Sequence, residues 1–289
     1  MSSIVYFNGQ WLPASEVAIP FNDRGFLFAD AVFETARLHR GRFFRLVQHL
    51  RRLHASARVL RIKPPPIPEL VHIVEETARR AALEEASLRI ILTAGAGGRG
   101  FSRVGASPPS LLVTIGPMAP DWLEKAARGW RIATASFRRP PEVCIPARLK
   151  ATGRIYALLA FLEAEEKGAD DALMLSSDGF VAEGTTWNVF WRTGDTLFTP
   201  ALDVGILEGV TRAIILELAA REGLDTREVR ATRVELDSAD EIFATMTSRG
   251  VVPFSHLDDR PLALSAGSLA ARLQRAYWAF VADELAHGE

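Results

Sequence analysis

The sequence has little cysteine and no excess of charge of either sign. Cys144 is the only cysteine among 289 residues, so an intrachain disulfide cannot form. Four-thiolate zinc and iron–sulfur sites are excluded for the same reason, and we expect no metal site. Lysine and arginine number 34 against 35 acidic residues, which gives a net charge of −1. This balance provides no field that would attract nucleic acid or an anionic membrane.

Long apolar runs and a secretory leader are also missing. No apolar run reaches the ~18 residues that a membrane-spanning helix needs. The first ten residues lack the basic stretch and apolar core of a signal peptide. We therefore expect a cytoplasmic protein without a membrane partner. Apolar residues make up 48% and charged residues 24%, which excludes a disordered or collagen-like chain.

The order of the expected elements predicts an α+β fold with two domains. Residues 1–117 are expected to form a small N-terminal α/β sandwich, residues 118–122 a linker, and residues 123–289 a larger C-terminal domain. An Asn8-Gly9 turn between apolar runs predicts the first hairpin. Apolar residues spaced by three and four positions predict a helix with one buried face over residues 46–60. The other elements expected in this half are a helix over 68–82 and strands over 31–39, 42–45, 88–94 and 110–115.

The second half is richer in expected strands, which favours a barrel-like β domain with peripheral helices. Turn residues such as Gly194-Asp195 separate short runs of apolar residues there. Strands are expected over 131–135, 172–175, 186–191, 196–198, 228–232, 241–245 and 251–254. Helices are expected over 122–127, 152–167, 210–221 and 265–284.

A glycine-rich loop, Gly95-Ala-Gly97-Gly98-Arg99-Gly100, matches the GxGxxG pattern of dinucleotide sites. That kind of site needs a helix directly after the glycines. Pro108-Pro109 and a further strand follow instead, which argues against a nicotinamide site. Two interpretations stay open: a hairpin connection, or a ligand loop in which Arg99 binds a carboxylate.

Lys150 lies among apolar residues at the entry to an expected helix. Such surroundings lower the pKa of an amine and give it nucleophilic character, as a catalytic lysine requires. The alternative is a surface lysine whose stem covers apolar area.

The segment from Glu183 carries the most specific pattern of the chain. It reads Glu183-Gly-Thr-Thr-Trp-Asn188-Val-Phe190, then Leu197-Phe-Thr-Pro200, then Leu207-Glu-Gly-Val-Thr-Arg212. This pattern closely resembles the signature of the class IV pyridoxal-phosphate aminotransferases. The resemblance extends from about Ile4 to Phe254. It includes Asn22-Asp-Arg-Gly25, Val32-Phe-Glu34, His49-Leu-Arg-Arg-Leu53 and Gly168-Ala-Asp-Asp-Ala-Leu-Met-Leu175.

The resemblance implies the type IV fold, pyridoxal 5'-phosphate as cofactor, and a homodimer with the cofactor at the domain interface. Lys150 resembles the lysine that holds the cofactor as a Schiff base, 33 residues before Glu183. Glu183 resembles the acid that pairs with the pyridine nitrogen. A carboxylate there keeps the nitrogen protonated, so that the ring absorbs negative charge from the substrate Cα.

The remaining cofactor contacts are implied by the same resemblance. Arg52, rather than its neighbour Arg51, matches the phosphate-binding arginine. The helix start at Gly209, Val210 and Thr211 matches the turn whose N–H groups bind the phosphate. The other two positions are the apolar Leu207, which packs on the ring face, and Thr247, which adds a hydroxyl to the phosphate.

The chain departs from the family in two places. Ala29-Asp30-Ala31 replaces a common Gly-Asp-Gly. Gly153-Arg154-Ile-Tyr156 stands where family aminotransferases place Asn and Tyr shortly after the lysine. Arg154 is therefore the candidate for binding the phenolic oxygen of the cofactor, and Tyr156 is the alternative.

The substrate contacts implied by the resemblance do not match one branch of the family. Arg99 aligns with the carboxylate-binding arginine of D-amino-acid aminotransferases, whereas Arg154 and Ser248-Arg249 resemble the aminodeoxychorismate lyases. We expect a transaminase that moves an amino group between an amino acid or amine and a 2-oxo acid by a ping-pong mechanism. The alternative is a lyase that gives 4-aminobenzoate and pyruvate. The candidate substrate-binding residues are Phe33, Arg37, Arg99, Ser248 and Arg249.

Overall fold

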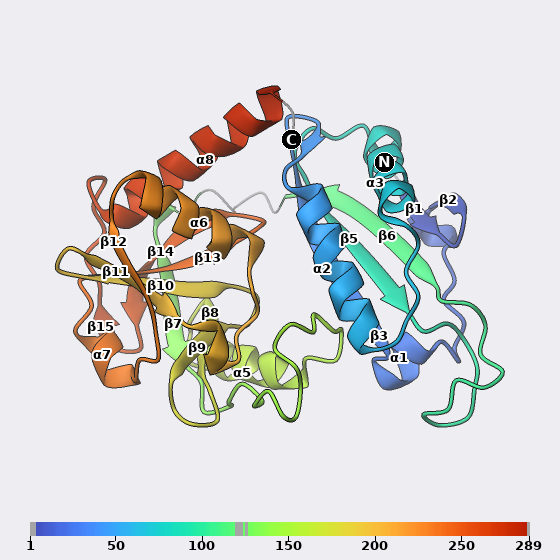
Figure 1. Ribbon diagram of the computed structural model, residues 1–289, viewed down its shortest axis with the longest axis horizontal. Coiled ribbons are helices and arrows are strands. Elements are labelled where there is room, and N and C mark those ends of the chain that lie inside the picture. The colour runs from blue at the N-terminus through green and yellow to red at the C-terminus, as the bar shows by residue number, and fades with distance from the viewer. Residues whose placement is uncertain (1–3, 119–123, 125–126, 288–289) are drawn as a thin grey trace. The chain divides into compact units, whose positions relative to one another are not determined.

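The computed structural model describes residues 4–118, 124 and 127–287 (Figure 1). The chain forms two compact units, and each has its own sheet. The first unit contains the chain up to Met118 and the segment Leu149–Gly153, and the second contains Ala119–Arg148 and Arg154–His287. Of the predicted linker only residue 118 is described, and the helix expected over 122–127 lies almost wholly outside the described residues.

The first unit is an antiparallel sheet of six strands with two long helices. The strand order is β2-β1-β6-β5-β3-β4, and every neighbouring pair is antiparallel. The strands are β1 (Ile4–Phe7), β2 (Gln10–Pro13), β3 (Ala31–His39), β4 (Arg42–Phe43), β5 (Ala86–Thr93) and β6 (Leu111–Pro117). The helices are the 3-10 turn η1 (Ala14–Glu16), α1 (Arg24–Phe28), α2 (Leu46–Val59) and α3 (Ile67–Ala81).

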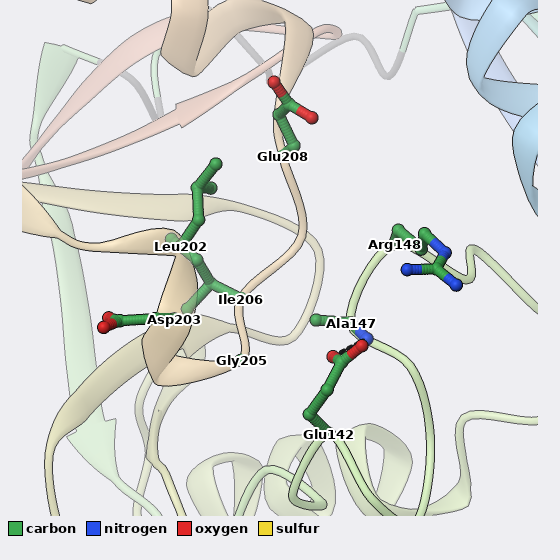
Figure 2. A pocket seen from close by; sticks show the side chains of 8 residues that line it. All are labelled: Glu142, Ala147, Arg148, Leu202, Asp203, Gly205, Ile206 and Glu208. Carbon is green, nitrogen blue, oxygen red and sulfur yellow. Dashed lines mark hydrogen bonds between the residues drawn. The ribbon is translucent and has the colours of Figure 1, made fainter.

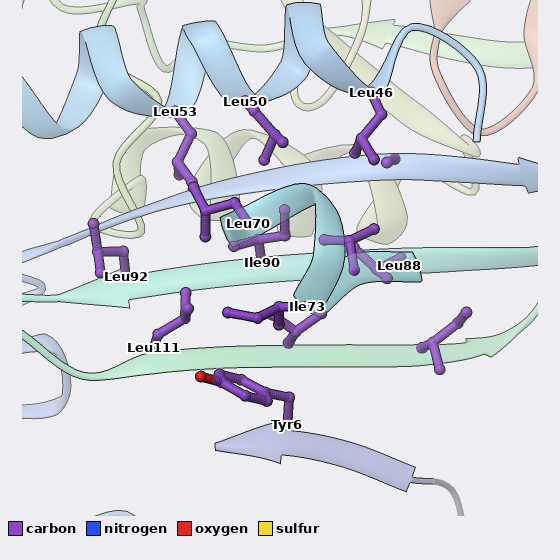
Figure 3. Close-up of a cluster of buried hydrophobic side chains, with 14 of the residues drawn as sticks. Tyr6, Leu46, Leu50, Leu53, Leu70, Ile73, Leu88, Ile90, Leu92 and Leu111 are labelled. Carbon is purple, nitrogen blue, oxygen red and sulfur yellow. The ribbon is translucent and has the colours of Figure 1, made fainter. Parts of the chain in front are cut away.

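Apolar side chains from the helices and from one face of the sheet form a common core in the first unit. Leu50 and Leu53 of α2, Leu70 of α3 and the alternate residues Leu88 and Ile90 of β5 are all 0% exposed. Figure 3 shows these side chains converging between the helices and the sheet. Burying each of them contributes about 1.5–3 kcal/mol, so this layer of helices on a sheet is the core that the periodicity predicted.

The segment Leu149–Gly153 corrects the sequence-based assignment of Lys150 to the larger domain. Phe33 N donates to Lys150 O at 3.0 Å, and Thr152 N donates to Ala31 O at 3.1 Å. These bonds join the segment to the edge of β3, because an extended chain satisfies its polar groups by pairing with a strand. The helix expected from residue 152 therefore begins only at residue 155.

The second unit is a barrel-like sheet with helices around it. Strands β10, β13, β14, β7, β8 and β9 follow one another, and a pairing of β9 with β10 closes the ring. β11 and β12 extend the sheet from β10, and β15 pairs with β14. The strands are β7 (Trp130–Thr134), β8 (Asp171–Leu175), β9 (Val181–Gly184), β10 (Asn188–Thr193), β11 (Thr196–Pro200), β12 (Asp225–Val229), β13 (Glu241–Met246), β14 (Gly250–Leu257) and β15 (Arg260–Pro261). The helices are α5 (Ile155–Glu166), the 3-10 turn η2 (Leu202–Val204), α6 (Val210–Arg221), α7 (Arg233–Asp237) and α8 (Leu269–His287).

Aromatic side chains fill the core of the second unit. Trp187 makes edge contacts with Trp130 at 6.4 Å and with Phe254 at 5.4 Å between ring centroids. A Cβ at Gly184 would lie 1.9 Å from the Trp187 ring, so this position accepts only glycine. The Glu183-Gly184 pair of the signature is thus fixed by packing at the turn between β9 and β10.

Several short elements were not predicted, and one strand was misplaced. Helix α1 is five residues long, too short to show a period, and it begins where the Asp23 carboxylate accepts from Gly25 N at 2.8 Å. Helix α7 is stabilised by a capping box between Thr232 and Glu235. β9 is also short, and β12 covers residues 225–229 instead of 228–232. Among the described residues no helix is long and apolar enough to cross a membrane.

Candidate active site

The first unit holds Lys150 against β3 and α2. Its backbone N donates to Ser56 Oγ of α2 at 3.1 Å, and its Nζ lies 4.6 Å from the centroid of the Phe33 ring. Lys150 is half-buried and Phe33 is buried. The ring face attracts an ammonium and limits its contact with water. Lys150 is therefore a held, partly desolvated amine and not a solvent-exposed surface lysine.

Arg52 is fixed in the same unit by a buried carboxylate. Its Nε and Nη2 donate to the two oxygens of Glu34 at 2.6 and 2.9 Å. Glu34 is 0% exposed, and its second partner is His49 Nδ1 at 3.0 Å. Arg51, by contrast, is exposed. This two-pronged pairing gives the Arg52 guanidinium one orientation, which favours Arg52 over Arg51 as an anion-binding group.

The charges in this triad determine its protonation. Burial acts to raise the pKa of the Glu34 carboxyl, but Arg52 and His49 outweigh it and hold that pKa well below its ordinary value. Burial lowers the pKa of His49, and Glu34 only partly opposes this effect. The triad therefore consists of a carboxylate, a guanidinium and a neutral imidazole at neutral pH.

The two predicted substrate arginines of the first unit have different surroundings. Arg37 is 4% exposed, and its Nη2 lies 2.5 Å from Glu85. Arg99 is exposed in the loop between β5 and β6. Its guanidinium forms no hydrogen bond or ion pair with any residue that the structure describes. Of the two, Arg99 has the donors available for a ligand.

In the second unit, Glu183 is a buried carboxylate with two partners. It lies on β9 opposite Asn188, at the pairing that closes the barrel. Its Oε2 accepts from Leu207 N at 2.9 Å, and its Oε1 lies 2.7 Å from Arg139 Nε. The side chains of Glu183 and Arg139 are 4% and 3% exposed. Arg139 also donates to the Tyr156 hydroxyl at 2.6 Å, so the carboxylate is held within a buried polar network.

The loop from Leu207 to Gly209 connects this carboxylate to the start of α6. Asn188 Nδ2 donates to Leu207 O at 2.9 Å. A Cβ at Gly209 would lie 2.1 Å from Asn188 Oδ1, so only glycine fits there. Gly209 has no side chain to cap α6, whose second residue, Thr211, is 3% exposed. The first N–H groups of a helix have no partner within the helix, and they bind anions readily.

The other predicted residues of the second unit lie at turns and helix ends. Thr247, Ser248 and Arg249 form the turn between β13 and β14, and the Arg249 guanidinium lies 5.0 Å from the Trp130 ring centroid. Arg154 directly precedes α5, with its guanidinium 5.9 Å from the Tyr156 ring centroid. The Tyr156 hydroxyl itself accepts from Arg139.

A pocket of about 320 Å³ lies beside the loop that carries Leu207. Figure 2 shows it between two loops of the second unit, one of them shaped by Ala147 N, which donates to Glu142 at 2.6 Å. Its lining combines four charged residues with four apolar or small ones. The residues are Glu142, Ala147, Arg148, Leu202, Asp203, Gly205, Ile206 and Glu208.

Sequence reasoning did not assign a role to several residues that hold the site. Arg139 follows the exposed Arg138, and nothing in the local pattern separates the two. Glu34 and His49 belong to motifs that resemble the family, but the sequence gave neither residue a role. The contact between Glu34 and Arg52 joins residues that are 18 positions apart. A buried charge is recognised only when its partner is known, and the partner comes from the fold.

Comparisons with known proteins show the family to which this chain belongs. The class IV amino-transferase family model matches residues 31–257. A putative branched-chain-amino-acid aminotransferase of Methanocaldococcus jannaschii is 34% identical over 89% of this chain and 88% of its own. The aminodeoxychorismate lyase of Bacillus subtilis is 30% identical over 95% and 93%. The solved T.th. branched-chain amino acid aminotransferase with pyridoxamine 5'-phosphate is 31% identical, with a TM-score of 0.91 over 97% of this chain and 94% of that one.

The predicted mixed fold, with a sandwich and a barrel-like domain, is therefore confirmed as the type IV fold. The chain belongs to the class IV aminotransferase family.

Proposed function

We propose that this protein is a pyridoxal-phosphate-dependent transaminase that moves an amino group between an amino acid or amine and a 2-oxo acid. One observation carries the proposal. The loop from Leu207 to Gly209 joins a buried carboxylate, Glu183, to a helix N-terminus that has no side-chain cap. A carboxylate and an anion site on one short loop match a ligand with a protonatable ring nitrogen and a phosphate.

The residues present fit that cofactor. Glu183, whose Oε1 lies 2.7 Å from Arg139 Nε, would pair with the pyridine nitrogen and hold it in its protonated form. The phosphate would be bound by Arg52, by Thr247 and by the N–H groups of Val210 and Thr211, at a helix start where a Cβ on residue 209 is excluded. The ring face would pack on Leu207. The phenolic oxygen would be bound by Arg154, and Tyr156 is the alternative, since its hydroxyl accepts from Arg139 and still has a proton to donate.

Lys150 is the proposed catalytic residue. When bound, pyridoxal phosphate supplies an electron sink for negative charge at the substrate Cα. Lys150 Nζ removes the Cα proton of the donor in the first half-reaction and returns a proton to Cα of the acceptor in the second. Phe33 keeps water from this amine, since its ring lies 4.6 Å from Nζ. Donor and acceptor use the site in turn, so the kinetics are ping-pong.

Substrate carboxylates are proposed to bind Arg99. Its guanidinium is exposed in a glycine-rich loop, and it presents a planar pair of donors. Arg249 and Ser248 are further candidates at the turn between β13 and β14. Arg37 is the weakest of these candidates, because this residue is only 4% exposed, whereas Arg99 is exposed.

The lyase reaction is the second candidate, and the 30% identity to an aminodeoxychorismate lyase over 95% of this chain supports it. Both reactions need a base at the substrate Cα and an electron sink, so Lys150 and Glu183 serve either one. They differ in whether a group leaves from the neighbouring carbon, which depends on how the pocket holds the substrate.

An amino-donor panel tests the proposal. Purified holoprotein is incubated with branched-chain L-amino acids, D-amino acids and simple amines, with 2-oxoglutarate or pyruvate as acceptor. Aminodeoxychorismate is tested in parallel. We expect stoichiometric transfer of the amino group, and no transfer by Lys150→Ala. Release of pyruvate and 4-aminobenzoate without amino transfer would establish the lyase instead. Inactivity towards every donor and towards aminodeoxychorismate would refute both candidates.

We also propose a homodimer, and exposed apolar side chains in each unit support it. In the first unit Phe21, Phe26 and Phe101 are 84%, 75% and 88% exposed. In the second, Ile155 and Leu158 on one face of α5 are 63% and 51% exposed. Exposed apolar residues in such number mark association surfaces, and two-fold dimers are the commonest closed assembly. Sedimentation should give twice the chain mass at assay concentration, and an active monomer would refute the dimer.

A further inference from the structure

A buried arginine in the first unit binds the backbone of the loop that carries Arg99. Arg24 is 1% exposed. Its Nη1 donates to Gly100 O at 3.1 Å and Ser102 O at 3.0 Å, and its Nη2 donates to Phe101 O at 3.1 Å. These carbonyls directly follow Arg99. A longer contact of 3.4 Å reaches the carbonyl of residue 97, on the other side of Arg99.

Asp30 holds this guanidinium in place. Its Oδ2 accepts from Arg24 Nε at 2.9 Å and from Arg103 Nε at 2.9 Å. Arg103 also donates to Leu60 O at 2.7 Å, at the end of α2. Arg24 is itself the first residue of α1, where its N donates to Gly95 O at 2.8 Å. The loop is thus tied at both of its ends and along its middle.

Glycine allows the close approach that this clamp requires. Gly98 has φ +81°, and a Cβ there would lie 2.3 Å from Ser102 O and 3.0 Å from Arg24 Nη1. Ser102 N donates to Arg99 O at 3.0 Å, which closes a tight turn over Gly100 and Phe101, directly after Arg99. A loop rich in glycine costs more conformational entropy to order than other loops do. Here a single guanidinium, which has five N–H donors, provides the order.

We propose that Arg24 is a positioning residue for substrate recognition: it holds residues 97–102 in the one shape that presents Arg99 to a substrate carboxylate. The inference rests on the proposed function, because it takes the carboxylate as the ligand of Arg99. The proposal gives a role to the motif Asn22-Asp-Arg-Gly25, whose arginine binds the loop, and to Asp30, which holds that arginine.

Arg24→Lys tests the proposal because lysine keeps the charge opposite Asp30. Its donors, however, sit on one nitrogen and cannot reach three successive carbonyls. We expect amide hydrogen exchange in residues 97–103 to become about tenfold faster or more, from the loss of charge-assisted bonds. KM for amino-acid donors should rise about tenfold while kcat stays within about twofold, as for lost ground-state binding. Arg260→Lys is the matched control, since Arg260 donates to two backbone carbonyls of the second unit and is not among the proposed site residues.

A double variant separates the clamp from the proposed function. If Arg24 acts through Arg99, Arg24→Lys should raise KM no further once Arg99→Ala is present. Unchanged exchange in residues 97–103, or an equal KM rise with and without Arg99, would overturn the proposal. So would a raised KM in Arg99→Ala and a normal KM in Arg24→Lys. A failure of the proposed function would be recognised separately, because the wild-type protein would then transfer no amino group.

Discussion

The buried pair of Glu183 and Arg139 gives a prediction that separates stability from catalysis. Glu183→Gln leaves the Arg139 guanidinium buried without a carboxylate, whereas Arg139→Met leaves Glu183 in the converse state. Both side chains are under 5% exposed and 2.7 Å apart. Breaking such a pair costs about 3–5 kcal/mol, mostly because the remaining charge is uncompensated. Each single variant of the protein without cofactor should lose free energy of unfolding in this range.

The double variant Glu183→Gln/Arg139→Met should behave differently. Replacing both charges of a buried pair is often neutral. We therefore expect the double variant to lie within about 1 kcal/mol of wild type, so that its loss falls short of the sum of the two single losses by at least about 5 kcal/mol. Catalysis should not recover, because the pyridine nitrogen would still lack its carboxylate. We expect kcat to be reduced about 10²-fold or more in both variants that lack Glu183.

Urea denaturation followed by tryptophan fluorescence measures the stability term. Trp130, Trp187 and Trp191 lie in the core of the second unit, so the signal reports on the unit that holds the pair. Single-variant losses that simply add in the double variant would refute the coupling. A double variant that regains activity along with stability would refute the electron-sink role of Glu183.

Three further predictions follow from the described contacts. Glu34→Gln should weaken the hold on Arg52 and raise the Kd for pyridoxal phosphate about tenfold, which corresponds to the loss of one charge-assisted hydrogen bond. Cofactor titration measures this Kd, and an unchanged affinity would remove Arg52 from the phosphate site. His49 has a lowered pKa in the folded state, so the unfolded chain binds more protons and stability should fall as pH falls through about 6.5. His49→Gln should make the stability less dependent on pH between about pH 7 and 5, as measured by the urea midpoint at each pH. An unchanged pH dependence of the midpoint would assign the effect to other groups. Gly209→Ala should lower cofactor affinity, because its Cβ would meet Asn188 Oδ1 at 2.1 Å; wild-type affinity would contradict the fit at this helix start.

Local sequence patterns were sufficient for much of the fold. The helical spacing in α2 placed Leu50 and Leu53 on a buried face, because this period depends only on backbone geometry. They gave no sign of α1, since five residues complete little more than one helical turn. They also placed Lys150 with the wrong unit, because its pairing with β3 joins residues more than 100 positions apart.

The candidate site was predictable in part. The signature gave Glu183, Leu207 and Gly209 as one group, and the structure brings Glu183 and Leu207 within 2.9 Å. The groups that hold the site were not predictable, since each depends on a partner distant in sequence. Arg139 meets Glu183 across 44 positions, and Arg24 meets the Arg99 loop across more than 70.

The central claim is that Lys150 carries the cofactor. The chain contains four lysines, namely Lys63, Lys125, Lys150 and Lys167, so the assignment has few alternatives. Holoprotein is reduced with borohydride, digested, and mapped by mass spectrometry. We predict that the reduced pyridoxyl group is found on Lys150 in stoichiometric amount and is absent from Lys150→Ala. A stoichiometric adduct on one of the other three lysines would contradict the account, because it would place the reacting amine away from Phe33 and Ser56.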